Sequence, residues 1–200
     1  MAQTNDGGDR FTKAHAAIFA AHAEDPTKTT INDQEMPYEV HYAQKMESYL
    51  SKRDPSASEV LKLAVCAQHF RRWEVPRSSY PMTKIGYHSW RSYLKKRQAQ
   101  QVGEILKAWY SEEEVEKCRA LIEKEGLKQG EEEVQVLEDV ACLVFLDDQF
   151  EAFKEKHDEE KMLGILRKTW GKMSERGREM ALEIPMTEEA KELVGKALKG

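Results

Sequence analysis

The sequence has few of the residues that mark special classes of protein. Its 200 residues include only three cysteines, Cys66, Cys118 and Cys142, and none of them forms a CxxC pair. An odd, sparse count argues against a disulfide framework and favours a reducing compartment. We therefore expect all three to be small buried hydrophobic residues. No apolar run approaches the roughly 20 residues needed to cross a bilayer, and the polar amino terminus has no signal-peptide core. These absences predict a cytoplasmic protein with no membrane partner.

Strand-like patterns are also scarce. Only 6 prolines and 11 glycines interrupt the chain, and no alternation of apolar and polar residues between turn residues indicates a sheet. A hydrophobic fraction of 40% beside 34% charged residues suits helices that expose one face. A chain of this length fits one core rather than two. The sequence predicts an all-α fold, a single globular helical bundle over residues 1–200 with a disordered tail at 1–8.

Helix-start and helix-stop residues divide the chain into segments. The predicted helices cover 9–23, 37–50, 54–73, 83–110, 111–126, 131–156 and 158–173, followed by short helices from Ser174 and from Thr187. Ser111 with Glu114 forms a capping box. Residues 140–146 are apolar on every side, so the helix over 131–156 should be the central buried one.

The net charge of −5 is unevenly distributed. Residues 69–97 carry eight Lys or Arg against one acid, whereas residues 111–160 carry 18 acids against six Lys or Arg. One end of the fold should therefore attract anions, and the other should stay solvated.

The main candidate site lies in residues 67–81, AQHFRRWEVPRSSYP. His69 follows an apolar run and should emerge near the core at the last turn of its helix. Arg72 and Trp73 lie three and four residues further on, on the same helical face. Arg77 and Tyr80 come from a loop that starts beside that helix end. Imidazole, guanidinium and phenol groups together suit an anion that is held and then protonated or deprotonated. The alternative is that His69 and the arginines satisfy terminal helix carbonyls.

Two further places carry carboxylates of interest. Glu138 and Asp139 precede the all-apolar stretch, so at least one should point inward and need a cation or a metal. Arg71, Arg72 or a metal shared with His69 are the expected partners, and a structural ion pair is the alternative. Glu39 is expected to complement the start of its own helix. His41, two residues on, is expected at the surface.

The predicted helix over 83–110 interleaves Tyr87, His88, Trp90 and Tyr93 with basic residues that include Arg91. Such a mixture can bind nucleic acid. The more usual explanation is an amphipathic helix with its aromatic residues in the core and its cations in water. The acidic pI of 5.8 also argues against nucleic acid.

Three strings identify a resemblance: 68–77 (QHFRRWEVPR), 137–146 (LEDVACLVFL) and 166–170 (LRKTW). They closely resemble an uncharacterised family, domain of unknown function 4202, over nearly the whole chain from Arg10 to Leu198. Membership implies little about activity.

A looser likeness is to the HD phosphohydrolase superfamily, whose helical bundles hold one or two metals with histidines and aspartates. This resemblance implies an HD-like bundle and one divalent metal ion bound by Glu39, His69 and Asp139. The defining His-Asp pair is absent here, since Phe70 follows His69. Gln98 and Gln100 also stand where related proteins tend to have His and Glu. Both departures favour a repurposed, metal-free pocket.

These observations suggest a small-molecule enzyme with an anionic substrate, phosphorylated or carboxylated. His69 would be the acid or base, and Asp139 or Glu138 would orient it or hold a metal. The residues expected to bind the anion are Arg71, Arg72, Trp73, Arg77, Tyr80 and Arg91. With a metal the reaction would be hydrolysis, and without one a lyase, isomerase or cyclase reaction. A non-enzymatic module that binds RNA or an acidic protein, or a protein-interaction domain with a structural polar pocket, is the alternative.

Overall fold

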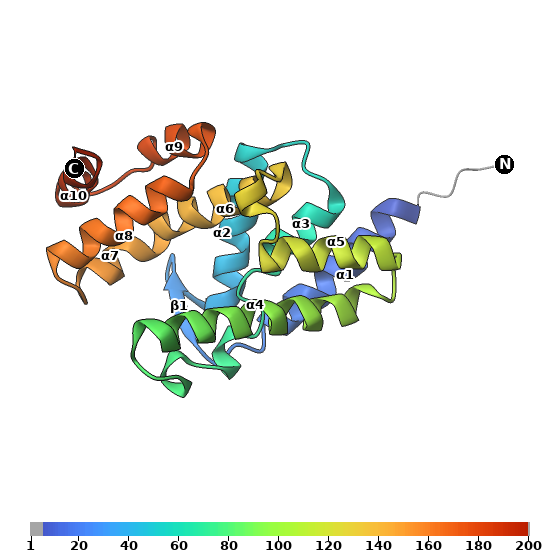
Figure 1. The fold of residues 1–200 in the computed structure, drawn as a ribbon. Coiled ribbons are helices and arrows are strands. Elements are labelled where there is room, and N and C mark those ends of the chain that lie inside the picture. Colours follow the sequence, from blue (N-terminus) through green and yellow to red (C-terminus); the bar gives the residue numbers. More distant parts are fainter. Residues whose placement is uncertain (1–5, 200) are drawn as a thin grey trace.

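The structure is a computed structural model that describes residues 6–199, and its helices enclose one continuous core (Figure 1). The first helices are α1 (Asp6–His22), α2 (Tyr38–Arg53), α3 (Glu59–Cys66), α4 (Lys84–Leu106) and α5 (Glu112–Glu123). The later helices are α6 (Glu132–Val144), α7 (Phe150–Lys154), α8 (Glu159–Lys172), α9 (Glu175–Leu182) and α10 (Glu188–Lys199). Short 3-10 turns lie at Arg72–Glu74, Arg77–Ser79 and Leu127–Gln129, and a π-helical turn covers Phe145–Gln149. The all-α prediction is confirmed.

The core is built on α3 and α6, the two most apolar helices. Six of the eight residues of α3 are buried, and so are nine of the thirteen residues of α6. α2 packs against both of them, and α5 packs against α3 and α4. α4 and α5 lie side by side on one side of the molecule, while α8 and α10 pair on another (Figure 1). No helix within residues 6–199 is long and apolar enough to cross a membrane.

One prediction of the secondary structure is wrong at residues 27–36. The segment between the predicted helices over 9–23 and 37–50, where no strand is expected, contains an antiparallel hairpin of β1 (Lys28–Ile31) and β2 (Gln34–Pro37), with Ile31 opposite Gln34. Asn32 and Asp33 form its two-residue turn with φ values of 51° and 62°. Asn and Asp tolerate this left-handed conformation, which the tight hairpin turn requires. The strands have only four residues each, too few to show an alternating pattern.

The helix predicted over 54–73 is much shorter than expected. α3 starts after the Ser58 cap and stops at Cys66. His69 and Arg71 then adopt left-handed backbone conformations, with φ values of 66° and 48°. Such conformations are uncommon for residues with a Cβ and cluster at functional sites. His69 therefore lies in a turn after the helix rather than on its last turn.

Two smaller boundaries also differ from the prediction. The expected tail at 1–8 is wrong for residues 6–8, because α1 begins at Asp6; residues 1–5 lie outside the described part of the chain. The predicted helix over 131–156 is divided by the π-helical turn at Phe145–Gln149. Turns of this kind often occur at functional sites.

Candidate functional site

The buried carboxylate of Glu39 holds the turn that carries His69. Its Oε1 accepts the backbone N–H of Arg72 at 2.7 Å, and its Oε2 accepts that of Arg71 at 3.0 Å. The same Oε2 lies 2.9 Å from Nδ1 of His22, whose Nε2 contacts the Cys66 carbonyl oxygen at 3.0 Å. Glu39 therefore binds the start of the 72–74 turn, not only the start of α2, and joins it to α1 and α3.

His69 lies against two side chains of the site. Its ring stacks on Tyr42 of α2, with ring centroids 4.1 Å apart, and its Nε2 is 2.7 Å from Nη1 of Arg72. Burial and the charges of Arg72, Lys124 and Arg91 lower the pKa of His69 well below its ordinary value. The imidazole is therefore neutral at pH 7 and able to accept a proton.

α4 supplies an aromatic wall beside His69. The Arg72 guanidinium lies over the Trp90 ring at 4.6 Å, and Trp90 donates its ring N–H to the Val75 carbonyl at 2.9 Å. Arg91 donates to the Tyr87 hydroxyl at 3.2 Å. Cation–π contact and stacking keep Arg72 in place without neutralising its charge.

Glu138 is surrounded by lysines. Its carboxylate pairs with Lys124 at the end of α5 and with Lys172 at 3.1 Å. The two lysine charges outweigh the opposing effect of burial and lower the pKa of Glu138 to about 2. Burial lowers the pKa of Lys95 of α4, and the nearby charges of Lys124 and Arg91 lower it further.

Near the π-helical turn, a second polar group faces α2. His41 is buried and its Nε2 lies 2.5 Å from Oδ1 of Asp148. Gln149 donates to the Tyr38 hydroxyl at 2.7 Å. Burial raises the pKa of Tyr38 to about 12, and the charge of Arg72 partly opposes that rise. The prediction that His41 lies at the surface is wrong, and these residues border the site.

The family model described as a domain of unknown function, DUF4202, matches residues 12–194. The chain belongs to this family. No curated protein and no solved structure matched the chain in the corresponding comparisons. The matched span of DUF4202 contains every residue of the site described above.

Glu138 and Asp139, of which at least one is predicted to point inward, are both buried, but their partners differ from those expected. Asp139 accepts from Arg53 Nε at 2.9 Å and from the Ser174 backbone N–H at 2.8 Å. It also accepts from Gln135 at 3.0 Å. The expected pairing with Arg71, Arg72 or His69 is not among the contacts of residues 6–199. Asp139 instead anchors the start of α9, while Glu138 pairs with Lys124 and Lys172.

The three expected metal ligands do not come together in the described part of this chain. In the described part of the chain, the ligand atoms of Glu39, His69 and Asp139 form no group within 4.8 Å of one another. Glu39 is committed to two backbone N–H groups and His22, and Asp139 to four donors. These donors do not fit a shared divalent ion.

The other predicted anion-binding residues separate into two groups. Arg72 and Arg91 act on His69 electrostatically, whereas Arg71 pairs with Glu24 at 2.5 Å and with Glu74 at 3.3 Å. Arg77 donates to the backbone carbonyls of Tyr80, Pro81 and Thr83 and so braces its own loop.

The two predicted aromatic lining residues make no ring contact with His69 within residues 6–199. Tyr80 packs near Tyr93 with ring centroids 6.3 Å apart. Trp73 is partly buried, and among the contacts of residues 6–199 neither ring touches His69. The structure therefore replaces them with Tyr42 and Trp90 as the aromatic neighbours of His69 and Arg72.

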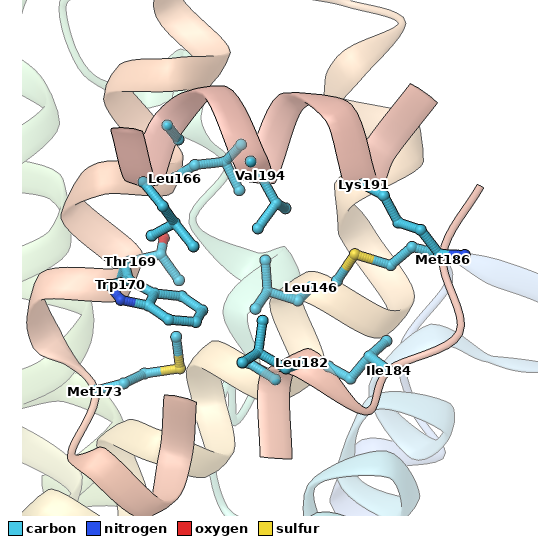
Figure 2. A pocket seen from close by; sticks show the side chains of 14 residues that line it. Leu146, Leu166, Thr169, Trp170, Met173, Leu182, Ile184, Met186, Lys191 and Val194 are labelled. Atoms are coloured by element: carbon cyan, nitrogen blue, oxygen red, sulfur yellow. The ribbon is translucent and has the colours of Figure 1, made fainter. Parts of the chain in front are cut away.

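The protein also has an apolar cavity of about 220 Å³ between α8, α9 and α10. Figure 2 shows Trp170, Leu182 and Val194 pointing toward one another around it. Lys191 is the one ionisable residue among those that line it. The cavity has no acid–base pair, so the polar group around His69 remains the better candidate for chemistry.

Sequence reasoning missed Tyr42, Trp90, Lys95, Lys124 and Lys172. Tyr42 belongs to an ordinary amphipathic pattern that does not mark it as a site residue. Lys172 is the last residue of α8, far from His69 in the sequence. Only Lys124 has a local signal in the sequence, since the Glu125-Gly126 pair that ends the helix follows it directly. In the structure Lys124 adopts a left-handed φ of 59°. Only the packing of α2, α4, α5 and α8 shows that these residues converge.

Proposed function

We propose that this protein is a small-molecule enzyme whose substrate is an anion, phosphorylated or carboxylated, and that His69 acts as its general base. The observation that carries the proposal is the neutral imidazole of His69 next to more positive charge than the site neutralises. Burial lowers the pKa of His69 most, and the charges of Arg72, Lys124 and Arg91 lower it further. Glu138 is the acid that pairs with Lys124 and Lys172. A bound anion would balance the remaining charge.

Gln98 supports this placement of the substrate. Its side-chain nitrogen is buried and has no hydrogen-bond partner within residues 6–199. Arg91, Lys95 and Gln98 are spaced by four and three residues along α4, so they share one face of the helix. An unsatisfied buried donor beside two cations is a natural contact for a substrate oxygen.

Proton transfer is the reaction that these groups support best. A neutral histidine can remove a proton from a substrate once the bound anion has drawn the Arg72 guanidinium away from Nε2. Arg72 and the lysines then stabilise the negative charge that develops. Lyase, isomerase and cyclase reactions all use this step. An HD-like, metal-dependent hydrolase is the weaker alternative, because Glu39 and Asp139 are already committed to other donors. The sparse cysteines favour a cytoplasmic location for such an enzyme.

The test combines ligand binding with turnover. Inorganic phosphate, pyrophosphate and a set of phosphorylated and carboxylated metabolites would be screened for an increase in melting temperature, and hits for turnover. Arg72→Gln should lose the increase, whereas the neighbouring Arg71→Gln, whose side chain pairs with Glu24 and Glu74, should keep it. His69→Gln should bind the hit but not turn it over. Unchanged binding in Arg72→Gln together with unchanged turnover in His69→Gln would refute the proposal.

A second candidate function rests on the exposed surface at the start of α4. Met82, Ile85, Tyr87 and Tyr93 are all exposed there, close to the cations Lys84 and Lys96 in the sequence. Exposed aromatic residues interleaved with cations can bind RNA or an acidic protein. Affinity for single-stranded RNA should then fall steeply with salt concentration. Absence of binding at low salt would exclude the RNA-binding function.

A further inference from the structure

A second group of ligating side chains lies on α1, α2 and α3, three helices that pack against one another. His15 comes from α1, Glu47 from α2 and Cys66 from the last position of α3. One ligand atom from each lies within 4.8 Å of the other two. His15 Nε2 and Glu47 Oε1 are 2.5 Å apart. The three ligand atoms lie outside the candidate site around His69, to which Cys66 contributes only its backbone carbonyl.

We propose that His15, Glu47 and Cys66 bind one zinc ion. Imidazole nitrogen, carboxylate oxygen and thiolate sulfur are the three donor types that zinc takes in proteins, at about 2.0–2.3 Å. Cys66 is fully buried, whereas the side chains of His15 and Glu47 are 30% and 32% exposed. The two partly exposed ligands can separate to admit the ion. Water would take the fourth position, as in zinc sites with three protein ligands.

The partly exposed pair of His15 and Glu47 differs from the buried His–Glu pair of the candidate site, His22 and Glu39. In that pair both nitrogens of His22 are used, and Glu39 accepts from two backbone N–H groups besides. No bond to a backbone N–H is recorded for Glu47 within residues 6–199. Glu47 also lines a solvent-open hollow of about 280 Å³, through which an ion can reach it. His22 and Glu39 are therefore fully used by other protein groups. His15 and Glu47 lie next to the Cys66 thiol, and an ion can reach Glu47 from solvent.

Cobalt is the best probe, because Co²⁺ replaces zinc and its bond to a thiolate absorbs in the near ultraviolet. The full chain would be stripped with a chelator, dialysed and titrated with Co²⁺. We expect saturation at one ion per chain, with the thiolate absorption, and displacement by Zn²⁺. Cys66→Ser should lose the absorption, while Cys118→Ser and Cys142→Ser, the other two buried cysteines, should keep it.

Folding of the variants needs a separate safeguard, since Cys66 is in the core. His15→Ala and Glu47→Gln change partly exposed residues and should each weaken Co²⁺ binding at least tenfold with an unchanged circular dichroism spectrum. Absorption without a thiolate band in the parent, or a band that survives Cys66→Ser, would overturn the proposal. Equal affinity in the parent, His15→Ala and Glu47→Gln would do the same. None of these outcomes bears on the proposed function of His69.

Discussion

The Arg72 guanidinium donates to Nε2 of His69 across 2.7 Å, so a permanent cation occupies the lone pair of the imidazole. Arginine has no acceptor, and Nε2 must therefore be the unprotonated nitrogen. The proton of the neutral ring is then on Nδ1. This contact fixes the tautomer of His69. Burial is the main cause of the low pKa of His69, and the positively charged Arg72 donor lowers that pKa further because it favours the neutral ring.

Removing the Arg72 charge should raise the pKa of His69. In Arg72→Gln the hydrogen bond can remain, but the repulsion between two cations is lost. The imidazole resonances of His69, followed by NMR from pH 4 to pH 9, should titrate at a higher pH than in the parent. Arg71→Gln is the matched control, because Arg71 pairs with Glu24 and Glu74 and is not among the charges that lower the pKa of His69. An unchanged titration in Arg72→Gln would contradict the interpretation.

The low pKa of His69 also predicts how stability depends on pH. In the unfolded chain His69 takes up a proton near its ordinary pKa of 6.5, whereas in the folded chain it does so only well below that value. The free energy of unfolding should therefore fall as the pH drops below 6.5, by at most about 1.4 kcal/mol per pH unit from this residue. His69→Gln should reduce this slope in urea titrations between pH 7 and pH 5. His88→Gln, at an exposed position of α4, should leave the slope as it is.

Of the two ion pairs that Glu138 makes, the pair with Lys124 should be the more costly one to break. Their side chains are 4% and 9% exposed, so Glu138→Gln leaves a buried cation and should destabilise the protein by about 3–5 kcal/mol at pH 7. Lys172 is 46% exposed, and without it Glu138 is still paired with Lys124. Lys172→Gln should therefore cost less than about 1 kcal/mol. Equal losses in the two variants would contradict the assignment.

Acid should remove the same contribution of Glu138. Its pKa is about 2 in the folded chain against an ordinary value of 4.5, so the stabilisation is complete above pH 4.5 and declines as the pH falls toward 2. Urea titrations of the parent and Glu138→Gln should therefore converge over that range. A constant difference between the two proteins from pH 6 to pH 3 would count against this pKa.

The sequence was sufficient for the helices, because apolar periodicity and caps such as Ser111 and Asp158 are local properties. It also predicted that at least one of Glu138 and Asp139 points inward, and both are buried. It failed where a distant side chain decides the local structure. α3 ends at Cys66 because Glu39, some thirty residues earlier in the chain, accepts the N–H groups of Arg71 and Arg72 in the turn that follows. Likewise, nothing near Asp139 indicates that Ser174, not His69, is its partner.

Glu39 should control the turn that presents His69. Because its carboxylate accepts the N–H groups of Arg71 and Arg72, Glu39→Ala should accelerate hydrogen exchange of these two amides relative to those in the middle of α6. Glu74→Gln is the control, since Glu74 pairs with the side chains of Arg71 and Arg97 and not with these N–H groups. Unchanged protection of both amides in Glu39→Ala would show that the turn holds itself.

Two glycines should respond to alanine in opposite directions. A Cβ on Gly177 of α9 would lie 2.6 Å from Oδ1 of Asp139. That oxygen is fixed by Ser174 and Gln135, so it has no room to move away. Gly177→Ala should therefore destabilise the protein by about 1–3 kcal/mol. Gly164, in the interior of α8, has nothing within 4 Å of such a Cβ, and Gly164→Ala should stabilise by about 0.5–1 kcal/mol. Urea denaturation at pH 7 measures both changes. If Gly177→Ala were as well tolerated as Gly164→Ala, Asp139 would not be held against α9, and its anchoring role would be lost.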